Sequence, residues 1–146
     1  MSRLVVDASV AVKWVVPEAG SAAALKLRAW PSLLAPELIV AECANILWKK
    51  VARGALTVGD ALLAAEILEH ASLTLYPMRS LVRSVTRMAI ELGHPAYDCI
   101  YLALAAREKC PMVTADERLA RKIAAARVPG LPEVLTLAEA ERLVAP

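Results

Sequence analysis

Four acidic side chains of this 146-residue chain stand where packing alone would not place a charge: Asp7, Glu42, Asp98 and Asp116. Asp7 and Asp116 each follow a short apolar run, Asp98 opens a longer one, and Glu42 interrupts an apolar stripe. A carboxylate at the end of a buried segment costs free energy unless a partner compensates its charge. We therefore expect the four acids to share a partner, and a divalent cation that prefers oxygen ligands is the natural candidate.

A shared cation would also define the chemistry of such a site. Like charges a few ångströms apart resist joint ionisation, whereas a bound cation keeps neighbouring carboxylates deprotonated. Oxygen ligands without His or Cys favour Mg²⁺ or Mn²⁺ over zinc. Such an ion activates water, orients a phosphate and neutralises charge during in-line displacement, so the acids predict phosphoryl chemistry.

Each acid also has a structural explanation of its own. Asp7 and Asp116 could cap the helices that follow them, and the acid that opens a helix would be favoured by the helix dipole. Glu42 has no capping role, and its structural explanation is a salt bridge to Lys13 or Lys49. Four unrelated explanations that converge on one edge of a sheet require more coincidence than one shared site.

Short apolar runs alternate with helical patterns along the whole chain. Strands are predicted at residues 3–7, 33–35, 73–76, 112–114 and 134–136. Helices are predicted at 8–16, 21–30, 36–53, 57–70, 80–92, 94–109, 116–126 and 137–144, with Ser21, Pro36 and Ser80 among their first residues. This alternation predicts one α/β domain over residues 1–146, with a central parallel sheet of four to five short strands covered by helices on both faces.

That architecture brings the acids together. In an open parallel sheet, ligands bind at the carboxyl ends of the strands. Asp7 and Asp116 stand at that edge directly, and Asp98 lies in the first turn of a helix that should begin nearby. Glu42 lies one turn after Leu38 on the protein-facing side of its helix, which would aim it at the sheet.

Composition and charge restrict the remaining classes. The chain is 58% hydrophobic, and its net charge of +2 is too small to indicate nucleic-acid binding by itself. Cys43, Cys99 and Cys110 form no CxxC pair, so we expect buried thiols and a reducing, cytoplasmic compartment. Charges interrupt every long apolar stretch, so neither a signal peptide nor a transmembrane helix is expected.

Four segments carry a resemblance to a known family. They are VVDAS at 5–9, PEL at 36–38 leading to Glu42 and Asn45, YDCIYLA at 97–103, and VTADERL at 113–119. No single segment is specific, but the ordered set covers nearly the whole chain. In this order and spacing the segments resemble the PIN-domain ribonucleases and, more narrowly, the toxins of VapBC toxin–antitoxin systems.

The resemblance implies a PIN-like domain that acts as a Mg²⁺- or Mn²⁺-dependent endoribonuclease and cleaves RNA with metal-activated water. The family's catalytic, metal-binding acids map onto Asp7, Glu42, Asp98 and Asp116. Its small hydroxyl residues, which support the acids, map onto Ser9 and Thr114. The resemblance also implies an antitoxin partner and a homodimer.

Other polar residues near the acids have weaker claims. Arg118, Arg121 and Lys122 follow the last acid and could flank an RNA path. His70 and His94 lie at helix ends without a nucleophile partner, so neither is assigned a catalytic role.

Two apolar segments look hard to cover within one small domain. They are residues 11–16 and the helix that carries Leu62, Leu63, Ile67 and Leu68. Because a monomer rarely exposes a large apolar patch, we expect a homodimer. A groove beside the acids would then hold an antitoxin segment whose arginine pairs with the carboxylates.

Three other functions stay open. A phosphoacceptor receiver domain needs an adjacent acid pair after its first strand, and this chain has Asp7 alone there. A phosphatase of the haloacid-dehalogenase type needs Asp-x-Asp, where this chain has Asp7-Ala8-Ser9. A catalytically silent PIN-like interaction module would keep the fold without cleaving RNA.

Overall fold

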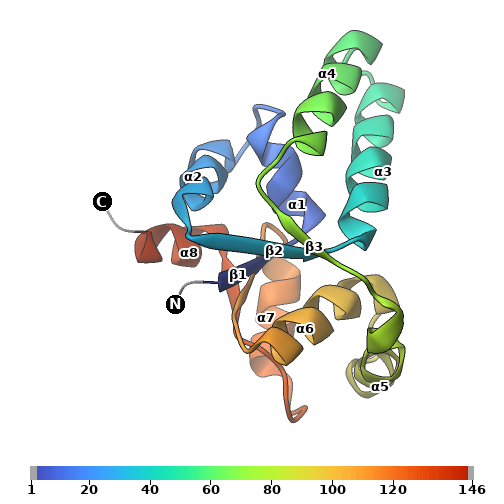
Figure 1. Ribbon diagram of the computed structural model, residues 1–146, viewed down its shortest axis with the longest axis vertical. Helices are drawn as coiled ribbons and strands as arrows, with labels where there is room; N and C mark the ends of the chain where they lie inside the picture. Colours follow the sequence, from blue (N-terminus) through green and yellow to red (C-terminus); the bar gives the residue numbers. More distant parts are fainter. Residues whose placement is uncertain (1–2, 145–146) are drawn as a thin grey trace.

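The computed structural model describes residues 3–144, and a parallel sheet of five strands runs through its centre. The strand order is β3-β2-β1-β4-β5, so the first strand of the chain is the middle one of the sheet (Figure 1). All four strand pairs are parallel. The strands are β1 (Arg3–Val6), β2 (Ser32–Pro36), β3 (Thr74–Tyr76), β4 (Met112–Thr114) and β5 (Val134–Thr136).

Helices cover both faces of this sheet. Figure 1 shows α1, α3 and α4 on one side and α5, α6 and α7 on the other. The helices are α1 (Ala8–Ala11), α2 (Ser21–Lys26), α3 (Leu38–Ala52), α4 (Val58–Glu69), α5 (Val82–Leu92), α6 (Ala96–Glu108), α7 (Glu117–Ala125) and α8 (Leu137–Leu143), with short 3₁₀ turns η1 (Val12–Trp14), η2 (Leu27–Ala29) and η3 (Arg79–Leu81). The predicted α/β fold, a parallel sheet with helices on both faces, is therefore confirmed. None of the helices within residues 3–144 combines the length and apolar character that a membrane crossing needs.

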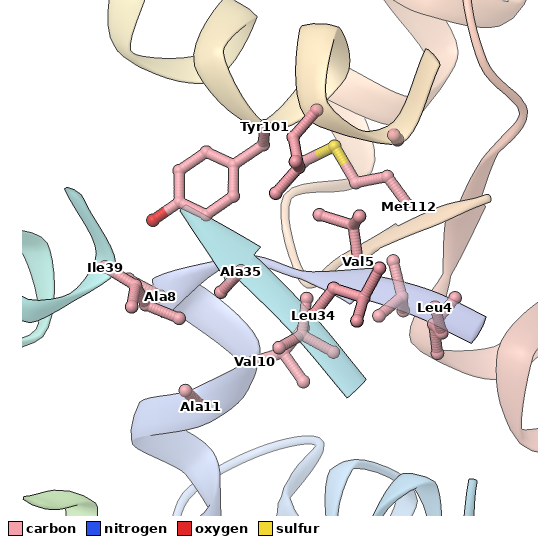
Figure 2. Close-up of a cluster of buried hydrophobic side chains, with 14 of the residues drawn as sticks. Leu4, Val5, Ala8, Val10, Ala11, Leu34, Ala35, Ile39, Tyr101 and Met112 are labelled. Atoms are coloured by element: carbon pink, nitrogen blue, oxygen red, sulfur yellow. The ribbon is translucent and has the colours of Figure 1, made fainter. Parts of the chain in front are cut away.

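The core lies on the two faces of β1 and β2. Leu4, Val5 and Val6 are fully buried, as expected for a continuous apolar strand in a parallel sheet. In Figure 2, Tyr101 from α6 reaches one face of the sheet, while Val10 from α1 lies against the other. Helix α6 packs on β1, β2 and β4, which fixes its first turn beside the carboxyl ends of those strands.

Two predicted helix starts and one predicted helix cap are wrong. Pro36 is the last residue of β2 and not the first of a helix, because the strand continues in register with β3 as far as Tyr76. Helix α2 begins at Ser21 as predicted, but Gly20 is its cap residue, since the Ser21 hydroxyl donates to Val16 O and accepts from the Glu18 N–H. Ser80 lies inside η3, and its hydroxyl accepts from Arg107, so α5 begins at Val82.

Of the two apolar segments that were predicted to lie uncovered on the surface, only one does. In residues 11–16, Ala11, Val12 and Val16 are buried in the core, so this segment offers no apolar patch. Helix α4 does expose apolar side chains on one face, although Leu68 is half-buried and packs against the core. Its exposed members are Val58, Leu62, Leu63 and Ile67.

Candidate active site

The four acids predicted from the sequence line one open pocket of about 550 Å³. Asp7 directly follows β1 and Asp116 follows the neighbouring β4, so both stand at the carboxyl edge of the sheet. Asp98 lies in the first turn of α6 and Glu42 in the second turn of α3. The structure therefore places these acids together, while their catalytic and metal-binding roles stay a prediction.

Asp7 is held by a network of short hydrogen bonds. The Ser9 hydroxyl donates to its Oδ1 and the Thr114 hydroxyl to its Oδ2, both at 2.5 Å, and the Val10 N–H caps Oδ1 at 3.2 Å. Burial nevertheless raises the pKa of Asp7 to about 6, against the opposing pull of these donors, and the charge of Asp98 adds to the rise. The predicted supporting hydroxyls thus contact the first acid directly.

The same two hydroxyls also connect β1 to β4. Ser9 Oγ accepts a hydrogen bond from the Ala115 N–H at 3.0 Å, and Thr114 Oγ1 accepts one from the Asp116 N–H at 3.1 Å. Asp7 and Asp116 are therefore joined through Thr114, whose side chain is fully buried. This fixes the spacing of the two strand-end acids.

Glu42 is held by a buried phenol. The Tyr101 hydroxyl donates to Glu42 Oε1 at 2.6 Å and so connects α6 to α3. Burial, followed by this contact with Glu42, raises the pKa of Tyr101 far above its usual range, so the hydroxyl stays protonated and acts as the donor. The alternative salt bridge is wrong, because Lys13 pairs with Glu18 and no ion pair of Glu42 occurs within residues 3–144.

The two remaining acids combine a structural contact with a place in the pocket. Asp116 Oδ1 caps α7 by accepting the Leu119 N–H at 3.1 Å. Asp98 Oδ2 contacts His94 Nε2 at 2.6 Å. In both acids the second oxygen accepts no hydrogen bond from residues 3–144, so capping and ligand binding do not exclude each other.

The donor set fits a hard divalent cation, since the acids in the pocket offer oxygen alone. Within residues 3–144 no three His, Cys, Asp or Glu side chains stand close enough to hold one metal ion as they are placed. Each carboxylate instead has a protein partner on at least one oxygen. A bound cation would therefore have to draw the remaining oxygens toward itself.

The predicted RNA-binding cations separate into two groups on α7. Arg118 and Arg121 are exposed, and Arg121 lies only 3.9 Å from Glu117 in a solvent-exposed pair. Lys122 instead contacts the turn before α6, with Nζ 3.0 Å from His94 Nδ1 and 3.4 Å from Gly93 O. None of the three lines the acidic pocket.

Comparison with known protein families shows which family has this sequence and fold. The sequence profile of the PIN domain matches residues 4–125. The chain belongs to the PIN-domain family. It is 32% identical over 133 residues to "Ribonuclease VapC3" of Pyrobaculum aerophilum, a match that covers 87% of this chain and 99% of the relative. It is also 33% identical over 116 residues to "Ribonuclease VapC9" of Mycobacterium tuberculosis, covering 80% and 87% of the two chains.

Solved structures show the same PIN-domain fold. A Pyrobaculum aerophilum protein designated PAE2754 has a TM-score of 0.73 at 22% identity, over 97% of this chain and 88% of that one. VapC20 of Mycobacterium tuberculosis, described as a sarcin-ricin loop cleaving toxin, has a TM-score of 0.63 at 15% identity, over 80% and 94%. VapBC2 of Rickettsia felis, bound to a promoter DNA fragment, has a TM-score of 0.65 at 13% identity, over 92% and 98%.

Sequence reasoning missed the side-chain partners of Glu42 and Asp98. Tyr101 lies one helical turn after Asp98 and is typical of a core aromatic, and only the folded structure shows that its hydroxyl reaches Glu42 of α3. His94 lies four residues before Asp98, which is a possible pairing distance on a helix, but it precedes the start of α6. Lys49, which the sequence suggested as a salt-bridge partner of Glu42, also lines the pocket.

Proposed function

We propose that this PIN-domain chain is a Mg²⁺- or Mn²⁺-dependent endoribonuclease and the toxin of a VapBC pair. The observation that carries the proposal is the convergence of four acids on one pocket at the carboxyl edge of the sheet. Support comes from the relatives of about one-third identity, which are named as VapC ribonucleases. The receiver and phosphatase alternatives have no comparable support.

In this mechanism Asp7, Glu42, Asp98 and Asp116 hold the metal through carboxylate oxygens. When bound, the ion would lower the pKa of a water molecule and offset the negative charge of the RNA phosphate. Ser9 and Thr114 fix the orientation of Asp7, and Tyr101 fixes that of Glu42. Because these donors are neutral, they hold the acids without cancelling the charge that attracts a cation.

RNA would approach the pocket over a rim of polar side chains. Asn45, Lys49 and Tyr97 line the pocket beside the acids, and Tyr97 is 64% exposed, which leaves its ring free to stack on a base. Arg118 and Arg121 project from α7, which Asp116 caps, and would contact phosphates farther along the strand. RNA as the substrate and the cytoplasm as the location follow from this reading.

The partners of the proposed toxin are an antitoxin and a second copy of the chain. The exposed apolar side chains of α4 would be covered by the second copy, because such a patch is unfavourable in water. An antitoxin segment would lie near the acidic pocket, where an arginine could pair with the carboxylates that the metal otherwise neutralises.

The direct test is cleavage of single-stranded and structured RNA by the purified protein. Cleavage should require Mg²⁺ or Mn²⁺, stop with EDTA, and fall by at least a hundredfold in Asp98→Asn. Asp60→Asn, an equivalent change of an exposed acid on α4, should cleave like wild type. Full activity in metal-free buffer would contradict the metal dependence, and a folded wild type that cuts no RNA would favour the silent interaction module.

A further inference from the structure

One histidine beside the pocket makes two short side-chain contacts that the proposed mechanism leaves unused. His94 Nε2 lies 2.6 Å from Asp98 Oδ2, and its Nδ1 lies 3.0 Å from Lys122 Nζ. The His94 side chain is 16% exposed, against 38% for Asp98. The ring thus stands between a candidate metal ligand on α6 and a cation on α7.

The chemistry of the three groups fixes the direction of their hydrogen bonds. An ammonium group has N–H donors and no acceptor, so Lys122 donates and Nδ1 of the ring accepts. The ring N–H is then on Nε2 and donates to the carboxylate of Asp98. Lys122 thereby selects the tautomer that His94 needs to hold Asp98.

The backbone keeps the ring in the same place. Gly93 ends α5 in the left-handed conformation with φ of 58°, and the His94 N–H donates to Ala89 O at 3.1 Å. Lys122 Nζ also lies 3.4 Å from Gly93 O, so the lysine contacts both the backbone and the ring of this turn. Pro95 then leads directly into α6. The turn is therefore tied to three helices at once.

We propose that His94, held by Lys122, is a positioning residue that orients Asp98 toward a divalent cation. The contact occupies Oδ2 of Asp98 and leaves Oδ1, which accepts no hydrogen bond from residues 3–144, for the ion. Loss of such an outer contact to a metal ligand typically weakens metal affinity by about 10–100-fold. This inference rests on the proposed function, because it takes Asp98 as a metal ligand.

The test is a Mn²⁺ titration of the metal-free, full-length protein at one fixed pH, followed by electron paramagnetic resonance. His94→Gln places an amide N–H near the position of Nε2 and should keep the affinity within about threefold of wild type. His94→Asn carries the same amide on a side chain one carbon shorter, out of reach of Asp98, and should weaken Mn²⁺ binding about tenfold or more.

Two lysine variants distinguish the contact of Lys122 with His94 from the general effect of its positive charge. Lys122→Met should weaken Mn²⁺ binding about threefold or more, although the loss of a positive charge near the acids would by itself tighten it. Lys26→Met on α2 removes the same charge from a surface ion pair with Glu141 of α8 and should leave the affinity unchanged. Tighter binding by Lys122→Met would contradict its role in holding the ring.

Wild-type or tighter Mn²⁺ binding by His94→Asn would overturn the proposal, as would equal losses in the Asn and Gln variants. Thermal melts give a second readout. In EDTA the Asn and Gln variants should melt within about 2 °C of each other, and Mn²⁺ should then stabilise the Gln variant more. Failure of the proposed function gives a different result, since wild type itself would bind no Mn²⁺ and cut no RNA.

Discussion

At the scale of single residues, Asp7 carries a charge in surroundings that oppose it. Its ordinary pKa of 3.8 rises to about 6 because the side chain is buried, even with three hydrogen-bond donors on it. The folded protein therefore binds this proton more tightly than the unfolded chain does. The neutral carboxyl of Asp7 therefore stabilises the folded protein at low pH. This stabilisation is lost as the pH rises from about 4 through about 6 and the carboxyl ionises.

Asp7→Asn removes this dependence while keeping the shape of the side chain. In EDTA the variant should match wild type near pH 4 and exceed its free energy of unfolding by roughly 3 kcal/mol at pH 7. Urea unfolding at the two pH values measures the difference. Added Mn²⁺ should narrow the gap at pH 7, because it binds the wild-type carboxylate. A stability difference between the variant and wild type that does not change with pH would contradict the raised pKa of Asp7.

Tyr101 tests whether the orientation of an acid matters for cleavage. Tyr101→Phe removes the hydroxyl that holds Glu42 and leaves the ring in the core. We expect RNA cleavage to fall about tenfold, with a loss of about 1–2 kcal/mol in unfolding free energy. Tyr76→Phe on β3, outside the pocket, is the matched control and should cleave like wild type. Cleavage by Tyr101→Phe at the wild-type rate would show that Glu42 needs no fixed partner.

At the scale of elements, the sequence predicted the alternation of strands and helices because each apolar run is bounded by a clear stop. Asp7 follows β1, and Gly93 ends α5. The sequence could not predict which strands pair, since β1 pairs with β4 across more than a hundred residues. For the same reason it indicated the four acids, with Ser9 and Thr114 as supports, but not the partner of Glu42: the contact with Tyr101 depends on where the fold places α3 and α6.

Two glycines give a matched test at this scale. Gly93 adopts a φ of 58° with no atom within 4 Å of an added Cβ, so Gly93→Ala should destabilise the protein by about 1 kcal/mol through backbone strain alone. Gly59 lies inside α4 without a positive φ, and Gly59→Ala should stabilise by several tenths to about 1 kcal/mol. Urea midpoints measure both changes. Equal effects of the two substitutions on stability would contradict the left-handed backbone at Gly93.

At the scale of the whole molecule, the apolar face of α4 is the feature that a single copy leaves uncovered. Leu62 is 66% exposed and Leu63 is 57% exposed, beside Ile67 at 49%. Leu63→Glu should shift a dimer toward monomer at micromolar concentration, because a charge in an apolar interface is costly. Light scattering reads the change directly. Val82→Glu on α5, where the side chain is 63% exposed, is the control and should leave the assembly unchanged.

The position of β1 in the middle of the sheet also has a consequence during synthesis. Its neighbour β4 begins at Met112, and the hydroxyl of Thr114 that binds Asp7 is 107 residues away along the chain. A ribosome adds about 5–20 residues per second, so several seconds separate the first acid from the last. A chain interrupted before β4 lacks both Thr114 and Asp116. Unfinished copies of the proposed ribonuclease therefore carry an incomplete site while they are still attached to the ribosome, which is itself made largely of RNA.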